Sequence, residues 1–147
     1  MRTFRSNYIT ITPGFFIYLA TAILLLPLKW VCAWFVASAF HEFFHYFALR
    51  LCGVRIFTIR ISSSGAIMET EAMHTSPEIL CALAGPLGGL LLLVLLRIFP
   101  AIAICAFVQS VFNLLPIYPF DGGRALRAII RVRRRKTPCK QAKVIVQ

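Results

Sequence analysis

Acidic residues are scarce in this chain, and so is charge of any kind. Only five of the 147 residues are Asp or Glu, whereas sixteen are Lys or Arg, which gives a formal net charge of +11. Charged residues make up 14% of the sequence, compared with about 25% in soluble globular proteins. Hydrophobic residues make up 59%. This balance excludes an ordinary soluble domain and predicts a membrane protein.

Cysteine is also sparse and irregularly spaced. The five cysteines include no C-x-x-C pair and are odd in number, so they predict neither a disulfide framework nor a thiolate metal site. The basic residues are not interleaved with aromatic residues on a polar surface, as nucleic-acid recognition would require. We therefore expect no nucleic-acid partner, and membrane topology explains the basic charge better.

Long apolar segments are abundant. A helix that crosses a bilayer needs about 17–25 residues, and four segments approach that length between the charged residues: 6–28, 30–49, 79–96 and 98–120. The first could instead be a signal peptide, but its small-residue triplet at 20–22 is followed by four more apolar residues, so cleavage there is disfavoured. The predicted fold class is an α-helical polytopic membrane protein with about four transmembrane segments.

The basic residues are distributed unequally between the two sides that four crossings would create. Arg2, Arg5, Arg50, Arg55, Arg60 and nine Lys or Arg from Arg124 onward, 14 in all, fall on the side of the termini. Lys29 and Arg97, 2 in all, fall on the other side. The positive-inside rule then places both termini and the central loop in the cytoplasm.

The second apolar segment contains HEFFH at residues 41–45. On a helix, His41 and His45 lie one turn apart on one face, with their Cβ atoms about 5–6 Å apart, so both imidazoles can reach one Zn²⁺. Glu42 is then a candidate general base. His41 lies about 16 Å along the helix from Trp30, near mid-membrane. The alternative is that the histidines only hydrogen-bond neighbouring helices, but three such residues in five positions favour a metal.

A catalytic zinc site usually takes three protein ligands. His74 and three of the remaining acids belong to a polar loop, whereas Asp121 closes the fourth apolar segment in FNLLPIYPFDGGR. Pro116 and Pro119 break the helix there, and the two following glycines permit a turn. Non-helical backbone at membrane depth is tolerated only beside protein or a watery cavity. Asp121 is therefore the best candidate for the third ligand.

Together, HEFFH and NLLPIYPFDGG resemble the paired motifs of the site-2 protease family of intramembrane zinc metalloproteases, and most closely its minimal sporulation-protein FB-like branch. The resemblance covers about residues 28–126. It implies that His41, His45 and Asp121 bind Zn²⁺ and that Glu42 is the catalytic base. Relatives commonly have Leu and Gly where this chain has Phe43 and Phe44, and Leu where it has Phe120.

Two further segments allow a structural and a functional interpretation. Residues 57–62 alternate apolar and polar side chains, and a Ser/Gly turn follows, which predicts a β-hairpin. The hairpin is either a cytoplasmic surface element or, as in relatives, a membrane-associated sheet edge that receives the substrate as an added strand. Asn113 either bonds a neighbouring helix or, as the family pattern implies, holds substrate or stabilises the oxyanion.

Small residues and the basic tail have simpler interpretations. Gly85 and Gly89, at four-residue spacing, predict close packing of the third span, which could bring it against the zinc helix. The basic tail predicts a topology determinant and a contact with anionic lipids. We divide the chain into a metalloprotease core at 1–126 and a basic cytoplasmic tail at 127–147.

The predicted function is zinc-dependent intramembrane proteolysis. The resemblance implies a multi-pass protein of a bacterial cell membrane, with a membrane-associated protein substrate such as a transcription-factor precursor, and it leaves room for a regulatory membrane partner. Two alternatives are a catalytically silent scaffold and a metal transporter. A scaffold would not need Glu42, and a transporter would need ligands at successive depths.

Overall fold

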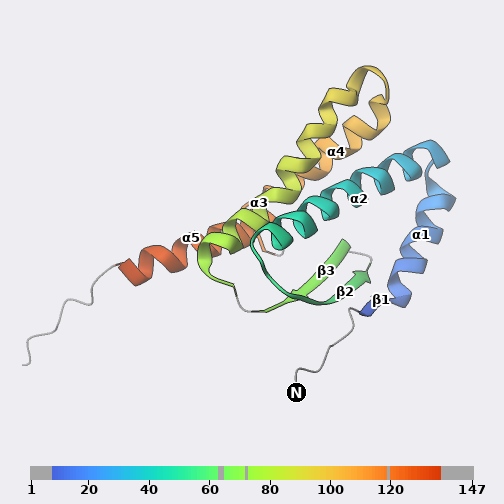
Figure 1. Cartoon of the computed structure of the whole chain (residues 1–147). Coiled ribbons are helices and arrows are strands. Elements are labelled where there is room, and N and C mark those ends of the chain that lie inside the picture. The colour runs from blue at the N-terminus through green and yellow to red at the C-terminus, as the bar shows by residue number, and fades with distance from the viewer. Residues whose placement is uncertain (1–7, 63–64, 72, 119, 137–147) are drawn as a thin grey trace, which may run out of the picture.

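The computed structural model describes residues 8–62, 65–71, 73–118 and 120–136. Strand β1 (Tyr8–Ile11) and helix α1 (Pro13–Leu25) are followed by the long helix α2 (Leu28–Leu51). Strands β2 (Ile56–Ser62) and β3 (Gly65–Thr70) follow. Helix α3 (Thr75–Leu91) continues as the 3₁₀ helix η1 (Leu92–Arg97), and helices α4 (Pro100–Asn113) and α5 (Asp121–Lys136) complete the described chain (Figure 1).

The helices pack through small side chains. Helix α2 contacts both α3 and α4, and α3 also contacts α5. One buried cluster joins Ala33 and Ala37 of α2 to Ala101 and Ala106 of α4, with Leu92 at the start of η1. Because alanine lets two helix backbones approach closely, this pattern is typical of helix packing within a membrane.

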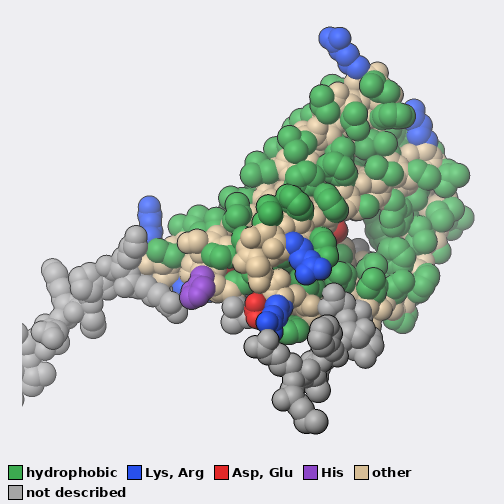
Figure 2. Space-filling model, in the orientation of Figure 1, with side chains coloured by type: hydrophobic (Ala, Val, Ile, Leu, Met, Phe, Trp, Pro, Cys, Tyr) green, Lys and Arg blue, Asp and Glu red, His purple; other side chains and the backbone are tan. Residues whose placement is uncertain are grey.

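Large hydrophobic side chains remain exposed around this core. Leu24 of α1 is 84% exposed and Val94 of η1 is 82% exposed. Figure 2 shows hydrophobic side chains over most of the visible face of the helices, with Lys and Arg near the ends of the molecule and near the sheet. Exposed apolar area of this extent marks a surface that contacts lipid or another protein.

The number of spans stays a prediction. In the part of the chain that the structure describes, one helical stretch, Thr75–Arg97 with 23 residues, is long and apolar enough to cross a membrane. Helices α1 and α4 are apolar but have only 13 and 14 residues. Helix α2 has 24 residues, which is sufficient length, but it carries the charged and polar HEFFH motif.

The predicted hairpin is present and belongs to a larger sheet. Strands β2 and β3 are antiparallel, with Ile61 opposite Ala66 and Ser62 opposite Gly65, and the two turn serines lie outside the described residues. Strand β1 adds to β2 in parallel, so the order is β1-β2-β3 and β3 forms one edge. The first predicted apolar segment is therefore not one continuous helix, because residues 8–11 pair with β2 before Pro13 begins α1.

Helix α5 begins at Asp121 and packs along α3 through Ala125 and Ala128, both buried. An ion pair of 2.9 Å between Arg131 and Glu78, in the first turn of α3, adds to this contact. The helix continues to Lys136 and projects beyond α3 (Figure 1). Helix α5 therefore continues without interruption through the predicted boundary between core and tail at residues 126 and 127. The division itself stays a prediction.

Candidate metal centre

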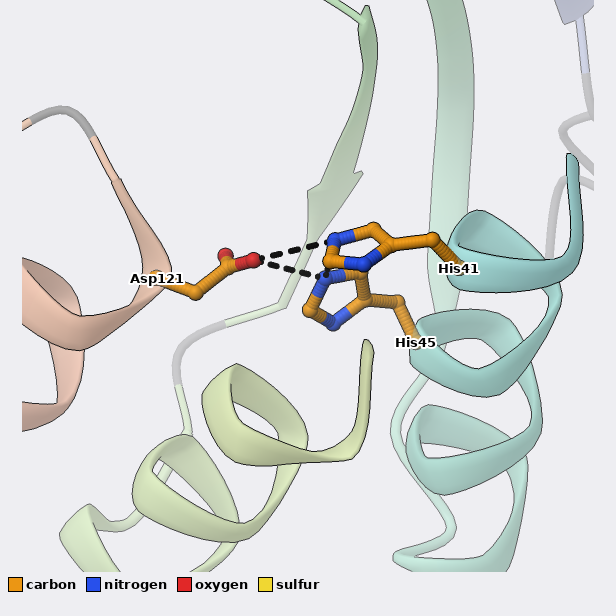
Figure 3. Close-up of side chains that lie close together, drawn as sticks. All are labelled: His41, His45 and Asp121. Carbon is orange, nitrogen blue, oxygen red and sulfur yellow. Dashed lines mark hydrogen bonds and ion pairs between the residues drawn. The ribbon is translucent and has the colours of Figure 1, made fainter. Parts of the chain in front are cut away.

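The two histidines of HEFFH point toward the same place. His41 and His45 lie one turn apart on α2, and their Nε2 atoms are 3.1 Å apart. His41 is only 3% exposed. Figure 3 shows both imidazoles extending from α2 toward Asp121. The spacing of the motif and the helical geometry of α2 produce this convergence, as the sequence predicted.

Asp121 reaches the histidines from the first residue of α5. Its Oδ2 atom lies 3.2 Å from Nε2 of His41 and 3.0 Å from Nε2 of His45, and the residue is 8% exposed (Figure 3). The preceding segment is non-helical, as the two prolines predicted. Gly122 and Gly123 allow it to pack closely, because a Cβ at Gly122 would lie 2.2 Å from the carbonyl oxygen of Leu114.

These three side chains fit a tetrahedral zinc ion. Their ligand atoms all lie within 4.8 Å of one another. Ligands at about 2.0–2.2 Å from zinc are separated by roughly 3.3–3.6 Å in a tetrahedron, close to the 3.0–3.2 Å observed. Two imidazoles and one carboxylate are also a donor set that catalytic zinc uses.

A hydrogen bond to the backbone orients His45. Its Nδ1 donates to the carbonyl oxygen of Cys81 on α3, at 2.7 Å. In the neutral ring, Nε2 then carries a lone pair that faces the carboxylate oxygen of Asp121. A metal-binding histidine usually donates its other ring N–H to a carbonyl in this way, so the contact with Cys81 fits a metal at Nε2.

Glycines on α3 make this arrangement possible. A Cβ at Gly85 would lie 2.2 Å from Nε2 of His45, and a Cβ at Gly88 would lie 2.1 Å from Cγ of Phe44. The third segment therefore packs against the histidine helix, as its small residues predicted. The large side chain of Phe44 fits here because Gly88 leaves room for its ring. Gly89 contacts Ser110 of α4 instead.

Glu42 lies beside the trio and contacts the sheet. Its Oε1 accepts a hydrogen bond of 3.3 Å from the backbone N–H of Ala66, on the edge strand β3. The carboxylate is outside the group of three ligand atoms. It lies next to the proposed metal ligands but separate from them, and its role as general base stays a prediction.

Asn113, the last residue of α4, also approaches His41. Its Nδ2 is 3.5 Å from Nε2 of His41. The amide thus lies close enough to donate to a substrate atom beside the metal, and its role in substrate binding stays a prediction. His74, in contrast, is exposed and precedes α3, outside the trio.

A cavity of about 940 Å³ connects these side chains. Its walls come from α1, α2, strands β2 and β3, α3, α4 and the start of α5. The unpredicted residues in the wall include Ser38 and Gln109, which are hydrogen-bonded to each other. Arg124, also in the wall, places Nη1 3.5 Å from Oδ1 of Asp121. Only the arginine had a sequence signal, since it follows Asp121 in the second motif.

Two comparisons of the sequence find similar proteins. The family model for Peptidase family M50 matches residues 91–147, which include Asp121. A zinc metalloprotease of Methanocaldococcus jannaschii is 29% identical over 110 residues, which cover 65% of this chain and 32% of that protein. The chain thus spans about a third of the length of this curated relative.

The fold is shared with a solved structure. A site-2 protease from Methanocaldococcus jannaschii superposes with a TM-score of 0.71 over 90% of this chain and 72% of that one, at 24% identity. At this identity the likeness establishes the fold, and it does so for nearly the whole chain.

Proposed function

We propose that this chain is a zinc-dependent intramembrane endopeptidase of the site-2 protease type, and the similarities to Peptidase family M50, to a zinc metalloprotease and to the fold of a site-2 protease support the proposal. The observation that carries the proposal is the placement of Glu42. The carboxylate lies beside three convergent metal ligands and on the rim of a cavity that one edge of the sheet also lines. Ligands, base and a place for an extended peptide therefore meet at one point.

His41, His45 and Asp121 would hold the zinc ion. When bound there, zinc acidifies a water molecule and polarises the scissile carbonyl. The Glu42 carboxylate takes a proton from the attacking water and gives it to the leaving amine, so that the peptide bond breaks with no net proton gained by the side chain. Asn113 donates from Nδ2 to the carbonyl oxygen as negative charge develops on it.

Strand β3 would hold the substrate. A transmembrane helix hides its own amides, so a segment must be extended before its peptide bond can be attacked. Backbone groups on the open edge of β3 can pair with such a segment as an added strand. Because Ala66 of this strand contacts Glu42, a paired substrate would lie beside the base.

The finer assignments extend the proposal. The substrate is a membrane-associated protein, such as a transcription-factor precursor, and the chain belongs to the minimal sporulation-protein FB-like branch. Both termini lie in the cytoplasm of a bacterial cell, with four spans in the membrane. Of the proposed tail, 127–147, residues 137–147 lie outside the described residues.

A scaffold and a transporter fit the geometry less well. A scaffold gains nothing from a carboxylate held next to the metal ligands without joining them. A transporter needs successive sites, whereas among the described residues only one group of three or more His, Cys, Asp or Glu side chains can hold a metal.

Metal content tests the proposed site. Purified wild-type protein should contain close to one zinc per chain, whereas His41→Ala and Asp121→Ala should each lose most of it, because zinc with two protein ligands is bound far more weakly. His74→Ala, which changes the remaining histidine, is the control and should retain zinc. Stoichiometric zinc in both site variants would contradict the proposed ligands.

A further inference from the structure

A polar pair lies in the wall of the catalytic cavity, away from the proposed zinc ligands. Nε2 of Gln109 donates to Oγ of Ser38 at 2.9 Å, which joins α4 to α2, and both residues line the cavity. Oε1 of Gln109 is buried and has no partner among the described residues. A buried acceptor without a donor costs free energy. The pair therefore contains an acceptor that the described residues leave unpaired, in a side chain that lines the cavity.

The pair lies about one helical turn from His41 and Asn113. Ser38 precedes His41 by three residues on α2, and Gln109 precedes Asn113 by four on α4. At 1.5 Å per residue these spacings are about 4.5 and 6 Å along the helices. Ser38 contacts Gln109 and His41 contacts Asn113, so α2 and α4 run in the same direction here. Both members of the pair therefore lie on the side of the site that faces the N-terminal end of α2.

Strand β3 covers the opposite side of the site. It begins at Gly65, Ala66 contacts Glu42, and Met68 packs beside Ala48 and Leu49 near the C-terminal end of α2. An added strand along the described residues of β3 would therefore be paired on that side of the scissile bond. On the other side, the backbone groups of a substrate would meet Ser38 and Gln109 instead.

We infer that Ser38 and Gln109 form a binding subsite for the backbone of an extended peptide, on the side of the scissile bond that β3 does not reach. The inference rests on the proposed protease function. Backbone groups on one edge of a strand repeat every two residues, about 6.6–6.8 Å, and Asn113 and Gln109 are about 6 Å apart along α4. A peptide whose scissile carbonyl lies at Asn113 thus brings a group of the same edge to Gln109.

The two side chains together complement a peptide backbone. Once the bond between the two side chains opens, Gln109 can supply Oε1 as an acceptor and the Ser38 hydroxyl can donate. Oε1 is shielded in this structure, but the terminal torsion of a glutamine amide is soft. A turn of the amide would bring the acceptor to the cavity. Gln109 and Ser38 act here as positioning residues, because neither takes part in bond cleavage.

An ester scan of the substrate tests the subsite. The assay uses full-length purified enzyme and a synthetic membrane-spanning peptide whose cleavage site by the wild type has been mapped. Single amide-to-ester replacements then remove one backbone N–H at a time around that site. Gln109→Met keeps the length of the side chain without hydrogen bonding, and Ser110→Ala, a buried change on the same helix, is the matched control.

For wild type, an ester two residues from the scissile bond should lower kcat/KM about two- to tenfold, the size of one hydrogen bond. In Gln109→Met, kcat/KM for the all-amide peptide should fall by a similar factor. The same ester should then cause no further fall in kcat/KM. Ser110→Ala should keep the wild-type ester penalty. Gln109→Asn should not restore the wild-type ester penalty, because the shorter side chain does not reach the peptide backbone.

Two results would overturn the inference, and they differ. Suppose that the wild type cleaves the peptide and that each ester lowers kcat/KM by the same factor in Gln109→Met as in the wild type. The pair is then only a bond between helices, and the protease function stands. If the wild type cleaves no membrane-spanning peptide while retaining zinc, the proposed function fails and the subsite fails with it.

Discussion

Glu42 is held by the edge of the sheet, since its Oε1 accepts a hydrogen bond of 3.3 Å from the N–H of Ala66. The contact depends on a backbone conformation that only glycine adopts easily. Gly65, the preceding residue, has a φ of 115°, and a Cβ there would lie 3.3 Å from the same carboxylate oxygen. The hairpin thus determines where the base lies, although it contributes no metal ligand.

Gly65→Ala should therefore lower activity without removing zinc. A side chain in this backbone region costs of the order of 1–3 kcal/mol, and the strand is expected to shift away from Glu42. We expect kcat/KM to fall about tenfold or more, with the zinc content unchanged. Gly53→Ala, at another positive φ with nothing within 4 Å, is the control for strain alone. Equal effects of both changes on activity would exclude a specific role for the hairpin.

Gly85→Ala should remove zinc from the protein. The added methyl group would lie 2.2 Å from Nε2 of His45, the proposed ligand atom itself. The imidazole must then move, and the bond from its Nδ1 to the Cys81 carbonyl should break with it. Gly89→Ala makes the same change one turn later, where it meets Ser110, and should reduce stability but retain zinc. Zinc measured in both variants after purification distinguishes the two, and full retention in Gly85→Ala would contradict the proposed packing.

The Phe44–Gly88 contact predicts a strong coupling between the two positions. Gly88→Ala should destabilise the protein by about 1–3 kcal/mol, because overpacking displaces the phenyl ring. In a Phe44→Ala background the same change should cost much less, since the ring is gone. Thermal unfolding of the two single variants and the double variant in one detergent gives the coupling. Additive losses would show that the two side chains do not share one space.

Much of this arrangement could be predicted from local patterns. HEFFH placed two imidazoles on one helical face, and the alternation in residues 57–62 indicated the hairpin. Strand β1 was missed because its four residues pair with a strand about 50 positions later, and no local period marks such a pairing. The Cys81 carbonyl was missed for a different reason, since every residue has one and only the packing of α2 on α3 selects it.

The structure also explains a departure that the sequence could only flag. Phe44, inside the metal motif, is too large for a closely packed helix pair when α2 is considered alone. Gly88, more than 40 residues later, supplies the missing space. Complementary sizes on different helices become visible only after the helices are paired.

Membrane topology is testable with reporter fusions. If four spans are present, reporters fused near Met1 and after Gln147 should both be cytoplasmic, in agreement with the positive-inside rule. A fusion at Arg97, between α3 and α4, should be on the opposite side. A C-terminal reporter outside the cell would mean that the first segment does not cross the membrane. Its helix has only 13 residues, which is short for a span.

The Glu42→Gln variant tests the central claim most directly. Glutamine keeps the size of the side chain and can still accept from Ala66, and Glu42 lies outside the three proposed ligands, so fold and zinc content should be retained. The amide cannot take a proton from the attacking water, so turnover of a membrane-spanning substrate should fall by about 10²–10⁴-fold. Cleavage and zinc are measured on the same preparations of wild type and variant. Full zinc with no detectable product is the predicted result, and a variant that cleaves as fast as wild type would contradict the assignment of Glu42 as the base.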